Sequence, residues 1–531
     1  MPLPPPQVGE AAGKISPEQT RQLFSLVDEL LKFSSEETGL PIKSEVKRQV
    51  TSRNAVESYL NTKMEEDESA KRMQRSEIVL KKFGLLDRDF TLKPFLLSLL
   101  KEQIEAYYDA KTKTVFMLDW VGINEQKPVL AHELTHALQD QHANLEKWND
   151  QTPDDISLNA SGDNDHLARD EMDTARTSVV EGQATAVMMD YILKPLGKSL
   201  VKNPEVLNLI QQRMNGGESS PMLARAPLLL SESLLFPYRE GLSFEQDVWM
   251  DQGQDAAFKG TLDRPPTSSW EIINPLEYEK QHVPAVLLMP NIHPLVDKLY
   301  KPYDIGQIGQ LDVRILTELF GGEQAARDLT PAWDGGIYWA GQKLSAKTPT
   351  EQASTSSIAF FYLSAWKNAA SAQIFAQLYA RELARKYSGV KFSHRRFKVY
   401  PPSASQSSNA DDFSDSVPES LEVATLPGEH IYTTSEGTVL ITTRGKMVFV
   451  AESFELDLAR KLTTLVLDAQ GAGEMHTAKA TDPKFITQPQ APTIHAETGE
   501  PLTASIIRFF SNCGVMKAAV DAAVIAAKLA K

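Results

Sequence analysis

Residues 132–136 read His-Glu-Leu-Thr-His, and no other segment constrains the fold of this chain as strongly. On an α-helix, side chains at positions i and i+4 lie on one face, so His132 and His136 can bind one metal ion. Glu133 projects beside them and can take a proton from metal-bound water. The flanking residues are apolar and indicate a buried helix, namely Leu130, Leu134, Ala137 and Leu138. Free histidines in a buried helix would need other partners. The segment therefore predicts a helix that carries a metal site rather than two surface histidines.

A catalytic zinc site needs a third protein ligand and keeps its fourth position open. Glu181 is the strongest candidate, because it is a lone carboxylate in an apolar, small-residue stretch of a second helical pattern. Such a buried carboxylate is unfavourable unless a metal or a cation compensates its charge. Gly182 and Ala184 would let this helix approach a neighbour closely. The competing interpretation is a salt bridge from Glu181 to Arg176 or Lys194.

Other downstream groups of a suitable type are His166, Asp163, Asp165, Asp170, Glu171 and Asp173. The last three stand beside Arg169 and Arg176 in the first half of the helical pattern 165–193, and we expect them to form a solvated face. They are therefore weaker ligand candidates than Glu181.

The segment His132 to Ala137, with Asp140 and a glutamate on a later helix, resembles the gluzincin metallopeptidases, the zincin branch that includes thermolysin. The resemblance covers roughly residues 100–195. In those enzymes edge strands precede the active-site helix, and Tyr107-Tyr108 and Val115–Leu118 stand in the corresponding place.

More closely, residues 132–141 and 180–182 resemble a group of mostly exported bacterial and archaeal zinc metallopeptidases, as do 236–241 and 333–338. The resemblance implies that His132, His136 and Glu181 bind Zn²⁺ and that Glu133 is the general base. It also implies a periplasmic or secreted location.

Two further residues follow from what such a site requires. An oxyanion forms when hydroxide attacks a carbonyl, and Tyr238, Arg239 and His282 are possible donors to it. Tyr238 is the preferred candidate, with aromatic core packing as the alternative. Many gluzincins carry an acidic residue one turn after the third ligand, whereas this chain has Thr185. Asp140, one turn beyond His136, is therefore the candidate for orienting a histidine.

Helical and strand patterns alternate along the chain and predict an α+β fold, with a β-hairpin over Ala106–Leu118 directly before the first motif. Strand patterns occur at 336–340, 357–364, 391–400, 430–433, 439–443 and 447–451, with helical patterns at 371–387 and 455–469. We predict a zincin-like metallopeptidase domain followed by a second α+β domain and a C-terminal helix. The predicted boundaries are 1–16 for a flexible tail, 17–250 for the catalytic domain, 251–302 for a connecting segment, 303–470 for the second domain with a polar insertion at 403–420, and 471–531 for a C-terminal extension.

Charge and hydropathy disfavour several classes of partner. The chain has 55 Lys+Arg and 70 Asp+Glu, a formal net charge of −15, which should repel nucleic acid. No stretch of about 18 uncharged residues exists, so no membrane span is expected. The chain as given does not begin with the basic and apolar regions of a signal peptide. Cys513 is the single cysteine and can form no intramolecular disulfide.

The combined prediction is a zinc metalloendopeptidase that acts on peptides or proteins. One alternative is a binding or scaffold protein that keeps the zinc fold without turnover, although a structural site does not require the base Glu133. A second alternative is a zinc hydrolase of a non-peptide amide, because water attacks the carbonyl in the same way in both reactions.

Overall fold

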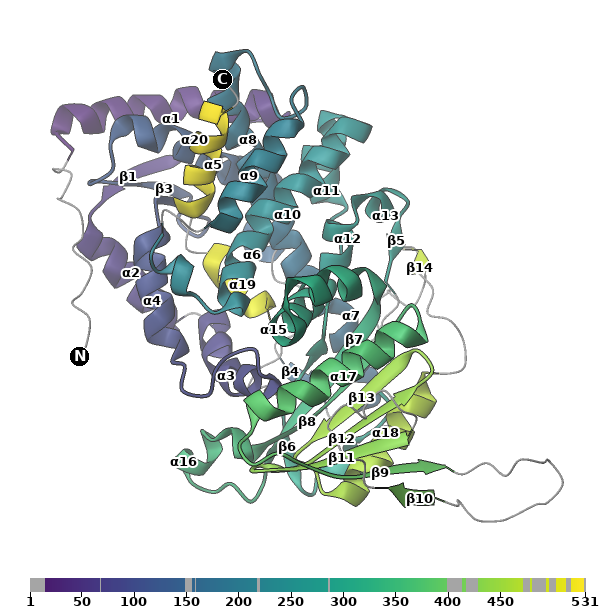
Figure 1. The fold of residues 1–531 in the computed structure, drawn as a ribbon. Coiled ribbons are helices and arrows are strands. Elements are labelled where there is room, and N and C mark those ends of the chain that lie inside the picture. Colours follow the sequence, from purple (N-terminus) through teal and green to yellow (C-terminus); the bar gives the residue numbers. More distant parts are fainter. Residues whose placement is uncertain are drawn as a thin grey trace.

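The structure is a computed structural model of the chain, drawn in Figure 1. It describes residues 15–66, 68–148, 155–157, 159–216, 220–284, 287–398, 413–416, 428–470, 478–479, 493–495, 503–511 and 517–529. Helices gather at one end of the molecule and a large sheet lies at the other (Figure 1). This mixture of helix and sheet agrees with the predicted α+β class. Most of the predicted tail and of the insertion 403–420 lies outside the described residues.

Helices dominate the first 300 residues. They are α1 (Pro17–Thr38), α2 (Arg53–Glu66), α3 (Glu68–Phe83), α4 (Leu92–Gln103), α5 (Ile123–Ala143), α6 (Leu145–Trp148), α7 (Ala160–Arg169), α8 (Met172–Leu193), α9 (Glu205–Gly216), α10 (Leu228–Gln252), α11 (Thr261–Asp263), α12 (Ser269–Ile273), α13 (Pro275–Glu279) and α14 (His293–Val296). Short irregular turns are η1 (Lys194–Leu196), η2 (Leu223–Arg225) and η3 (Ala256–Gly260). Three of the long helices, α5, α8 and α10, pack against one another in the order α5, α8, α10.

The first helix shows why local sequence is enough to set a helix start. Ser16 Oγ accepts a hydrogen bond from the backbone N–H of Gln19 at 3.2 Å, and Gln19 Oε1 accepts one from the N–H of Ser16 at 2.7 Å. This reciprocal pair satisfies two backbone donors that have no partner within the helix. At the other end, Gly39 has a φ of 70°, which a residue without a Cβ adopts at no steric cost.

A small sheet lies beside α5. It has the order β1-β3-β2, built from β1 (Lys47–Thr51), β2 (Ala106–Asp109) and β3 (Thr114–Leu118). The pairing of β2 with β3 is antiparallel and confirms the predicted hairpin. However, β1 pairs in parallel with β3, so the strand over Val115–Leu118 is central rather than an edge strand as expected. The strand β2 is an edge of this sheet.

The large sheet is eight-stranded and antiparallel throughout, in the order β10-β9-β11-β12-β13-β8-β7-β6. Its strands are β6 (Tyr300–Gln307), β7 (Trp333–Lys343), β8 (Ile358–Trp366), β9 (Lys391–Lys398), β10 (Phe413–Ser416), β11 (Gly428–Thr434), β12 (Gly437–Arg444) and β13 (Met447–Glu452). The accompanying helices are α15 (Gln310–Leu329), α16 (Pro349–Gln352), α17 (Ala369–Lys386) and α18 (Leu456–Ala469), with the turns η4 (Thr330–Ala332) and η5 (Thr355–Ser357). The six predicted strands correspond to β7, β8, β9, β11, β12 and β13.

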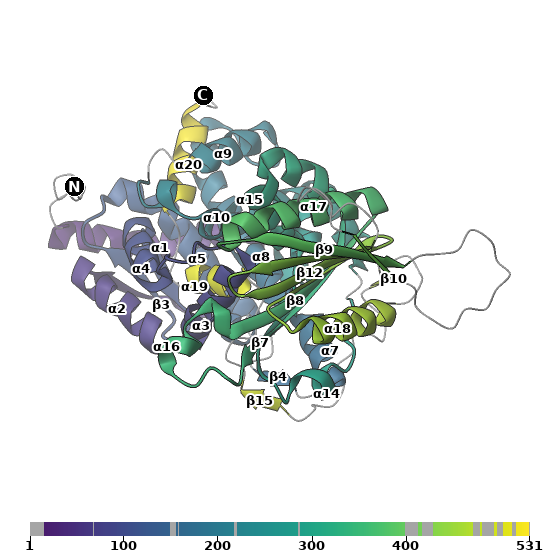
Figure 2. The same cartoon turned by 60° about the horizontal axis from the view of Figure 1, so that its bottom comes forward.

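Both faces of the large sheet are covered, with α15 and α17 on one side and α18 on the other (Figure 2). The strand β8 is buried along its whole length, and its residues alternate between the two faces. Phe360 and Tyr362 pack in the same hydrophobic cluster as α17, whereas Phe361 and Leu363 pack with α18. Burial on both sides explains why this segment is a continuous apolar run instead of an apolar and polar alternation.

The helical part and the large sheet share one hydrophobic core. Phe83 of α3 packs against Tyr338, Phe360 and Tyr362 of the sheet, at ring-centroid distances of 5.4, 4.5 and 5.8 Å. Next to it, the buried ammonium group of Lys82 donates to Glu436 Oε2 at 2.7 Å. The core therefore runs from residues of the predicted catalytic domain into the predicted second domain.

The C-terminal residues return to the helical part. The helices α19 (Ala504–Ser511) and α20 (Lys517–Leu529) pack there, α19 against α3, α8 and α10, and α20 against α4, α8 and α9. Four short strands form the pairs β5 (His282–Val283) with β14 (Ala478–Lys479), and β4 (Asp155–Ser157) with β15 (Thr493–His495). None of the helices in the described ranges has the length and apolar character that crossing a membrane requires.

Candidate metal centre

The helix α5 extends from Ile123 to Ala143 and contains the predicted metal-binding motif. Gly122 precedes its first turn, and Asn144 ends it in the left-handed region with a φ of 56°. Residues Val129 to Asp140 are all buried, because α1 and α8 pack against this helix. The motif therefore lies inside the protein, as its apolar neighbours predict.

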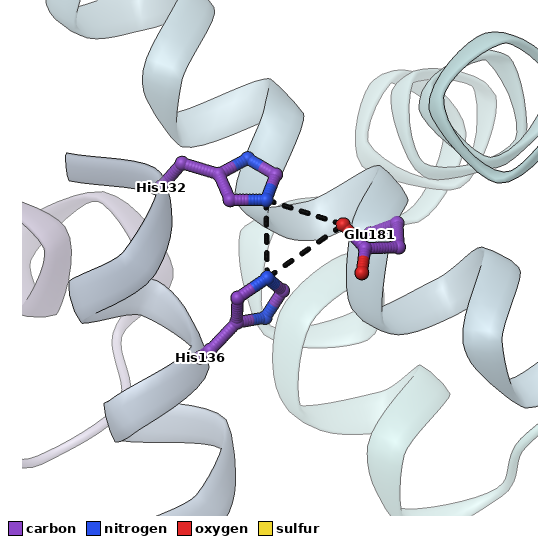
Figure 3. Close-up of side chains that lie close together, drawn as sticks. All are labelled: His132, His136 and Glu181. Carbon is purple, nitrogen blue, oxygen red and sulfur yellow. Dashed lines mark hydrogen bonds and ion pairs between the residues drawn. The ribbon is translucent and has the colours of Figure 1, made fainter. Parts of the chain in front are cut away.

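His132, His136 and Glu181 converge on one point between α5 and α8 (Figure 3). The Nε2 atoms of the two histidines are 3.0 Å apart. Glu181 Oε2 lies 3.2 Å from Nε2 of His132 and 3.6 Å from Nε2 of His136. The structure thus brings together the three residues that the sequence predicts as ligands, and the alternative partners Arg176 and Lys194 bind elsewhere.

This donor set fits a divalent transition metal. Two imidazole nitrogens and one carboxylate oxygen are the protein ligands of many catalytic zinc sites. With metal–ligand distances of about 2.0–2.2 Å, ligand atoms at the corners of a tetrahedron stand about 3.3 Å apart. The observed separations of 3.0–3.6 Å bracket that value, so these residues could bind one metal ion.

The three groups share a strong electrostatic coupling. Burial lowers the pKa of His136, but the charge and hydrogen bond of Glu181, together with Glu133 and Gln139, outweigh this effect and raise that pKa to about 9. Burial likewise raises the pKa of Glu181, whereas the adjacent His136 and His132 lower it overall, well below its ordinary value. His136 and Glu181 therefore stabilise the charged form of each other, and a metal ion bound between them would take the place of a proton.

Gln139 orients His136. Its Oε1 lies 2.9 Å from Nδ1 of His136, and an amide oxygen can only accept, so Nδ1 carries a proton and Nε2 is left for a metal. Gln139 Nε2 donates to the backbone carbonyl of Val180 at 3.0 Å and to Gln183 Oε1 at 2.9 Å. These bonds fix the amide in place and connect the two ligand helices.

The sequence suggests Asp140 for this role, and the structure corrects that expectation. The Asp140 carboxylate accepts hydrogen bonds from Tyr108 Oη at 2.8 Å and Lys113 Nζ at 2.7 Å, both in the β-hairpin. It also accepts the backbone N–H of Leu145 at 3.2 Å. Asp140 therefore fastens α5 to the small sheet, because it lies on the side of the helix that faces the hairpin.

Glu133 and Tyr238 lie close to the three ligands. Glu133 is fully buried, and its charge also raises the pKa of His136, although less than Glu181 does. The ring of Tyr238, on α10, stacks on that of His132 with a centroid distance of 6.1 Å and an interplanar angle of 25°. Both residues thus lie near the histidines, and Tyr238 is also a buried member of the hydrophobic core, as the alternative of aromatic core packing expects.

The approach of α8 to α10 depends on two glycines. A Cβ atom on Gly182 would lie 2.3 Å from the carbonyl oxygen of Gly241, and one on Gly241 would lie 2.2 Å from that of Ser178. Such distances are too short for any side chain, so the two backbones are in direct contact. This confirms the expectation that Gly182 permits close packing, and it brings Glu181 and Tyr238 to the same region.

The acids at the start of α8 are not a solvated face. Asp170, Glu171 and Asp173 have at most 2% of their surface exposed. Asp170 Oδ2 accepts the backbone N–H of Gln307 at 2.5 Å, and Glu171 Oε2 accepts that of Ser269 at 3.0 Å. These carboxylates hold the connecting segment and β6, and the single predicted helix is divided here into α7 and α8.

Gln139, Gln183 and Ser511 are site residues that the sequence argument missed. Gln139 stands three positions after His136, so helical spacing could have revealed it. Ser511 donates from its hydroxyl to Glu181 Oε1 at 2.5 Å, across 330 residues of chain, and no local pattern indicates such a contact. Comparison of the chain with family profiles, with curated proteins and with solved structures gave no match.

Proposed function

We propose that this protein is a zinc-dependent metallopeptidase. The observation that carries the proposal is the convergence of His132 Nε2, His136 Nε2 and Glu181 Oε2, all buried, with Glu133 on the same helix. A buried site that is only structural would need no carboxylate beside the metal ligands. The resemblance to gluzincins supports the same assignment, since a strand hairpin precedes α5 and the glutamate stands on a later helix.

In the proposed reaction, the residues of the chain position water and move one proton. A bound zinc ion would be held by His132, His136 and Glu181 and would supply Lewis acidity that lowers the pKa of water to about 7. Glu133 takes the proton of the attacking water and delivers it to the leaving amine. Tyr238 donates a hydrogen bond to the oxyanion that develops on the carbonyl oxygen when water attacks the carbonyl carbon. Gln139 keeps His136 in the orientation that ligation requires.

A second candidate is a zinc-binding protein without turnover. It is favoured by the enclosure of the site, since His132, Glu181 and His136 are only 0%, 1% and 7% exposed. The base Glu133 argues for catalysis, because a silent site would not need it. A zinc hydrolase of non-peptide amides uses the same residues and differs only in substrate.

Metal analysis tests the zinc assignment. Full-length protein purified without chelator is expected to contain one zinc ion per chain, and Glu181→Gln should lose it on dialysis. The matched control is Asp190→Asn, which alters another buried carboxylate of α8 away from the ligands. Equal zinc retention in the two variants would show that Glu181 is not the third ligand.

Substitution of the base tests catalysis. Glu133→Gln keeps the size of the side chain and leaves the ligands intact, so zinc content should remain at the wild-type level. Hydrolysis of an unstructured protein should fall by about 10²- to 10⁴-fold, which is the usual contribution of a general base. If the wild type cleaves in a chelator-sensitive way and this variant cleaves equally fast, the assigned mechanism is wrong.

A further inference from the structure

The helix α19, which precedes the C-terminal helix α20, lies inside the protein beside the metal centre. It contacts α8, which carries Glu181, α10, which carries Tyr238, and α3 (Figures 1 and 2). Its apolar side chains face this interior, since Ile506, Ile507 and Phe510 are 0%, 1% and 2% exposed. Their spacing of one and four residues forms a single apolar face on a helix.

The last residue of α19 contacts a predicted ligand directly. The hydroxyl of Ser511 donates to Oε1 of Glu181 at 2.5 Å, while Oε2 of the same carboxylate faces the two histidines. The segment therefore reaches the carboxylate of Glu181 itself, and each of the two carboxylate oxygens has a partner within the chain.

A catalytic zinc site must admit a substrate carbonyl to the open coordination position. In this structure the ligands and Glu133 are almost fully buried, and α19 fills the space between α3, α8 and α10. A peptide that is to be cleaved needs room beside Glu133 and Tyr238. The helix α19 packs on both α8 and α10, and it belongs to the C-terminal extension. It is short, and the hydroxyl of Ser511 bonds it to Glu181. It can therefore be displaced more easily than the long helices that carry the site.

We propose that α19 closes the metal centre and that its release opens the site to substrate. This inference rests on the proposed function and adds its regulation. A tethered segment competes with substrate at an effective concentration in the millimolar range, so the closed form dominates until α19 is displaced. The space that holds Ile506, Ile507 and Phe510 would then receive bulky apolar side chains of a substrate.

The first experiment weakens the packing of α19 against α3, α8 and α10 in the full-length, zinc-loaded protein. The variant Ile507→Ala/Phe510→Ala removes buried apolar contacts, and Leu462→Ala on α18 is the matched control, because Leu462 is equally buried on the far face of the large sheet. We measure hydrogen exchange of residues 503–511 and the rate at which a chelator removes zinc. The double variant should show faster exchange there and zinc removal at least about ten-fold faster, and Leu462→Ala should show neither change.

The second measurement uses the wild type, so it does not depend on the folding of a variant. In low concentrations of urea, zinc removal should follow the local opening of residues 503–511, with a smaller urea dependence than global unfolding. If zinc leaves only as the whole protein unfolds, α19 does not control access to the site. Faster exchange of α19 in the double variant without faster zinc removal would overturn the proposal in the same way.

Hydrolysis separates this inference from the proposed function. With α19 loosened, cleavage of peptides rich in bulky apolar residues should rise about ten-fold or more above the wild type, and Glu133→Gln in the same background should abolish it. Faster zinc removal without any hydrolysis would leave the closure by α19 intact and overturn the peptidase assignment. Zinc-loaded wild type that cleaves as fast as the double variant would overturn the closure and support the peptidase.

Discussion

Gln139 connects the two helices that carry the ligands, through hydrogen bonds of both its side-chain oxygen and its side-chain nitrogen. Its oxygen accepts from His136 Nδ1 at 2.9 Å, and its nitrogen donates to Val180 and Gln183 on α8. An apolar residue of similar length would leave the buried N–H of His136 without a partner. Because the hydrogen bond of that N–H fixes the imidazole ring, its loss should lower the metal affinity more than it lowers the stability of the fold.

We therefore expect Gln139→Met to weaken zinc binding by about 10- to 100-fold, the usual effect of losing a group that orients a ligand. Gln139→Glu keeps the acceptor for Nδ1 and should bind zinc more tightly than Gln139→Met. Competition with a chromogenic chelator measures both affinities. Equal affinities in the two variants would show that His136 does not depend on this acceptor.

Asp190, near the end of α8, gives a pH-dependent prediction. Burial raises its pKa from 3.8 to about 6, and Glu37 adds to this, although the bond from the N–H of Leu200 opposes it. Well below its ordinary pKa of 3.8, the carboxyl is protonated in both the folded and unfolded states. As the pH rises to 6, the unfolded state releases the proton first, so the folded state is destabilised, and above pH 6 the full effect of about 3 kcal/mol is present.

Asp190→Asn removes the charge and keeps an acceptor for Leu200. Relative to the wild type, the variant should gain about 2–3 kcal/mol in the free energy of unfolding between pH 4 and pH 6, with no further change above. Urea unfolding at half-unit steps of pH measures this difference. A difference that is constant from pH 4 to pH 8 would contradict the raised pKa.

Among elements, the pair α8 and α10 controls the geometry of the site. The two helices touch backbone to backbone at Gly182 and Gly241, adjacent to Glu181 and three residues from Tyr238. Gly182→Ala would place a methyl group 2.3 Å from the carbonyl oxygen of Gly241, so the helices must separate. A change of this kind moves a ligand together with its helix.

For Gly182→Ala we expect a loss of about 1–3 kcal/mol in the free energy of unfolding and weaker zinc binding. The control is Ala184→Gly on the same helix, which should lower stability by about 1–2 kcal/mol through helix propensity and the loss of one buried methyl group, and leave zinc affinity unchanged. Calorimetry and zinc titration measure the two quantities. A stable Gly182→Ala variant with wild-type zinc affinity would show that the contact is not required.

Over the whole molecule, the helical part and the large sheet are joined by a buried ion pair as well as by the shared core. Lys82 Nζ donates to Glu436 Oε2 and to Ser453 Oγ, each at 2.7 Å. Burial lowers the pKa of Lys82 to about 8, although the charge of Glu436 opposes this effect. An ammonium group this buried is stable only with its partner.

We expect Lys82→Met to destabilise the protein by about 3 kcal/mol, and we expect helical part and sheet to lose stability together. In the double variant Lys82→Met/Glu436→Gln, the loss should be smaller than the sum of the single losses, because the two residues interact. Urea unfolding followed by probes in each part measures this coupling. Two separate transitions, with only one shifted by Lys82→Met, would show that the parts fold independently.

Local sequence determined the helices and strands whose periodicity and end signals are contained within a few residues. Ser16 begins α1, the hairpin precedes α5, and alternating or continuous apolar runs mark the strands β7, β8, β9, β11, β12 and β13. The strand β1 was not predicted, because the stretch Lys47–Thr51 is mostly polar, has no apolar pattern, and becomes a strand only by pairing with β3.

The candidate ligands also follow from local sequence, since i and i+4 spacing brings His132 and His136 together in any helix. Glu181 was selected by its apolar neighbours, which local sequence contains. The burial of Asp170, Glu171 and Asp173 and the contact of Ser511 with Glu181 arise from tertiary packing. These depend on partners about 100 to 330 residues away, and packing between distant segments leaves no periodic trace in either one.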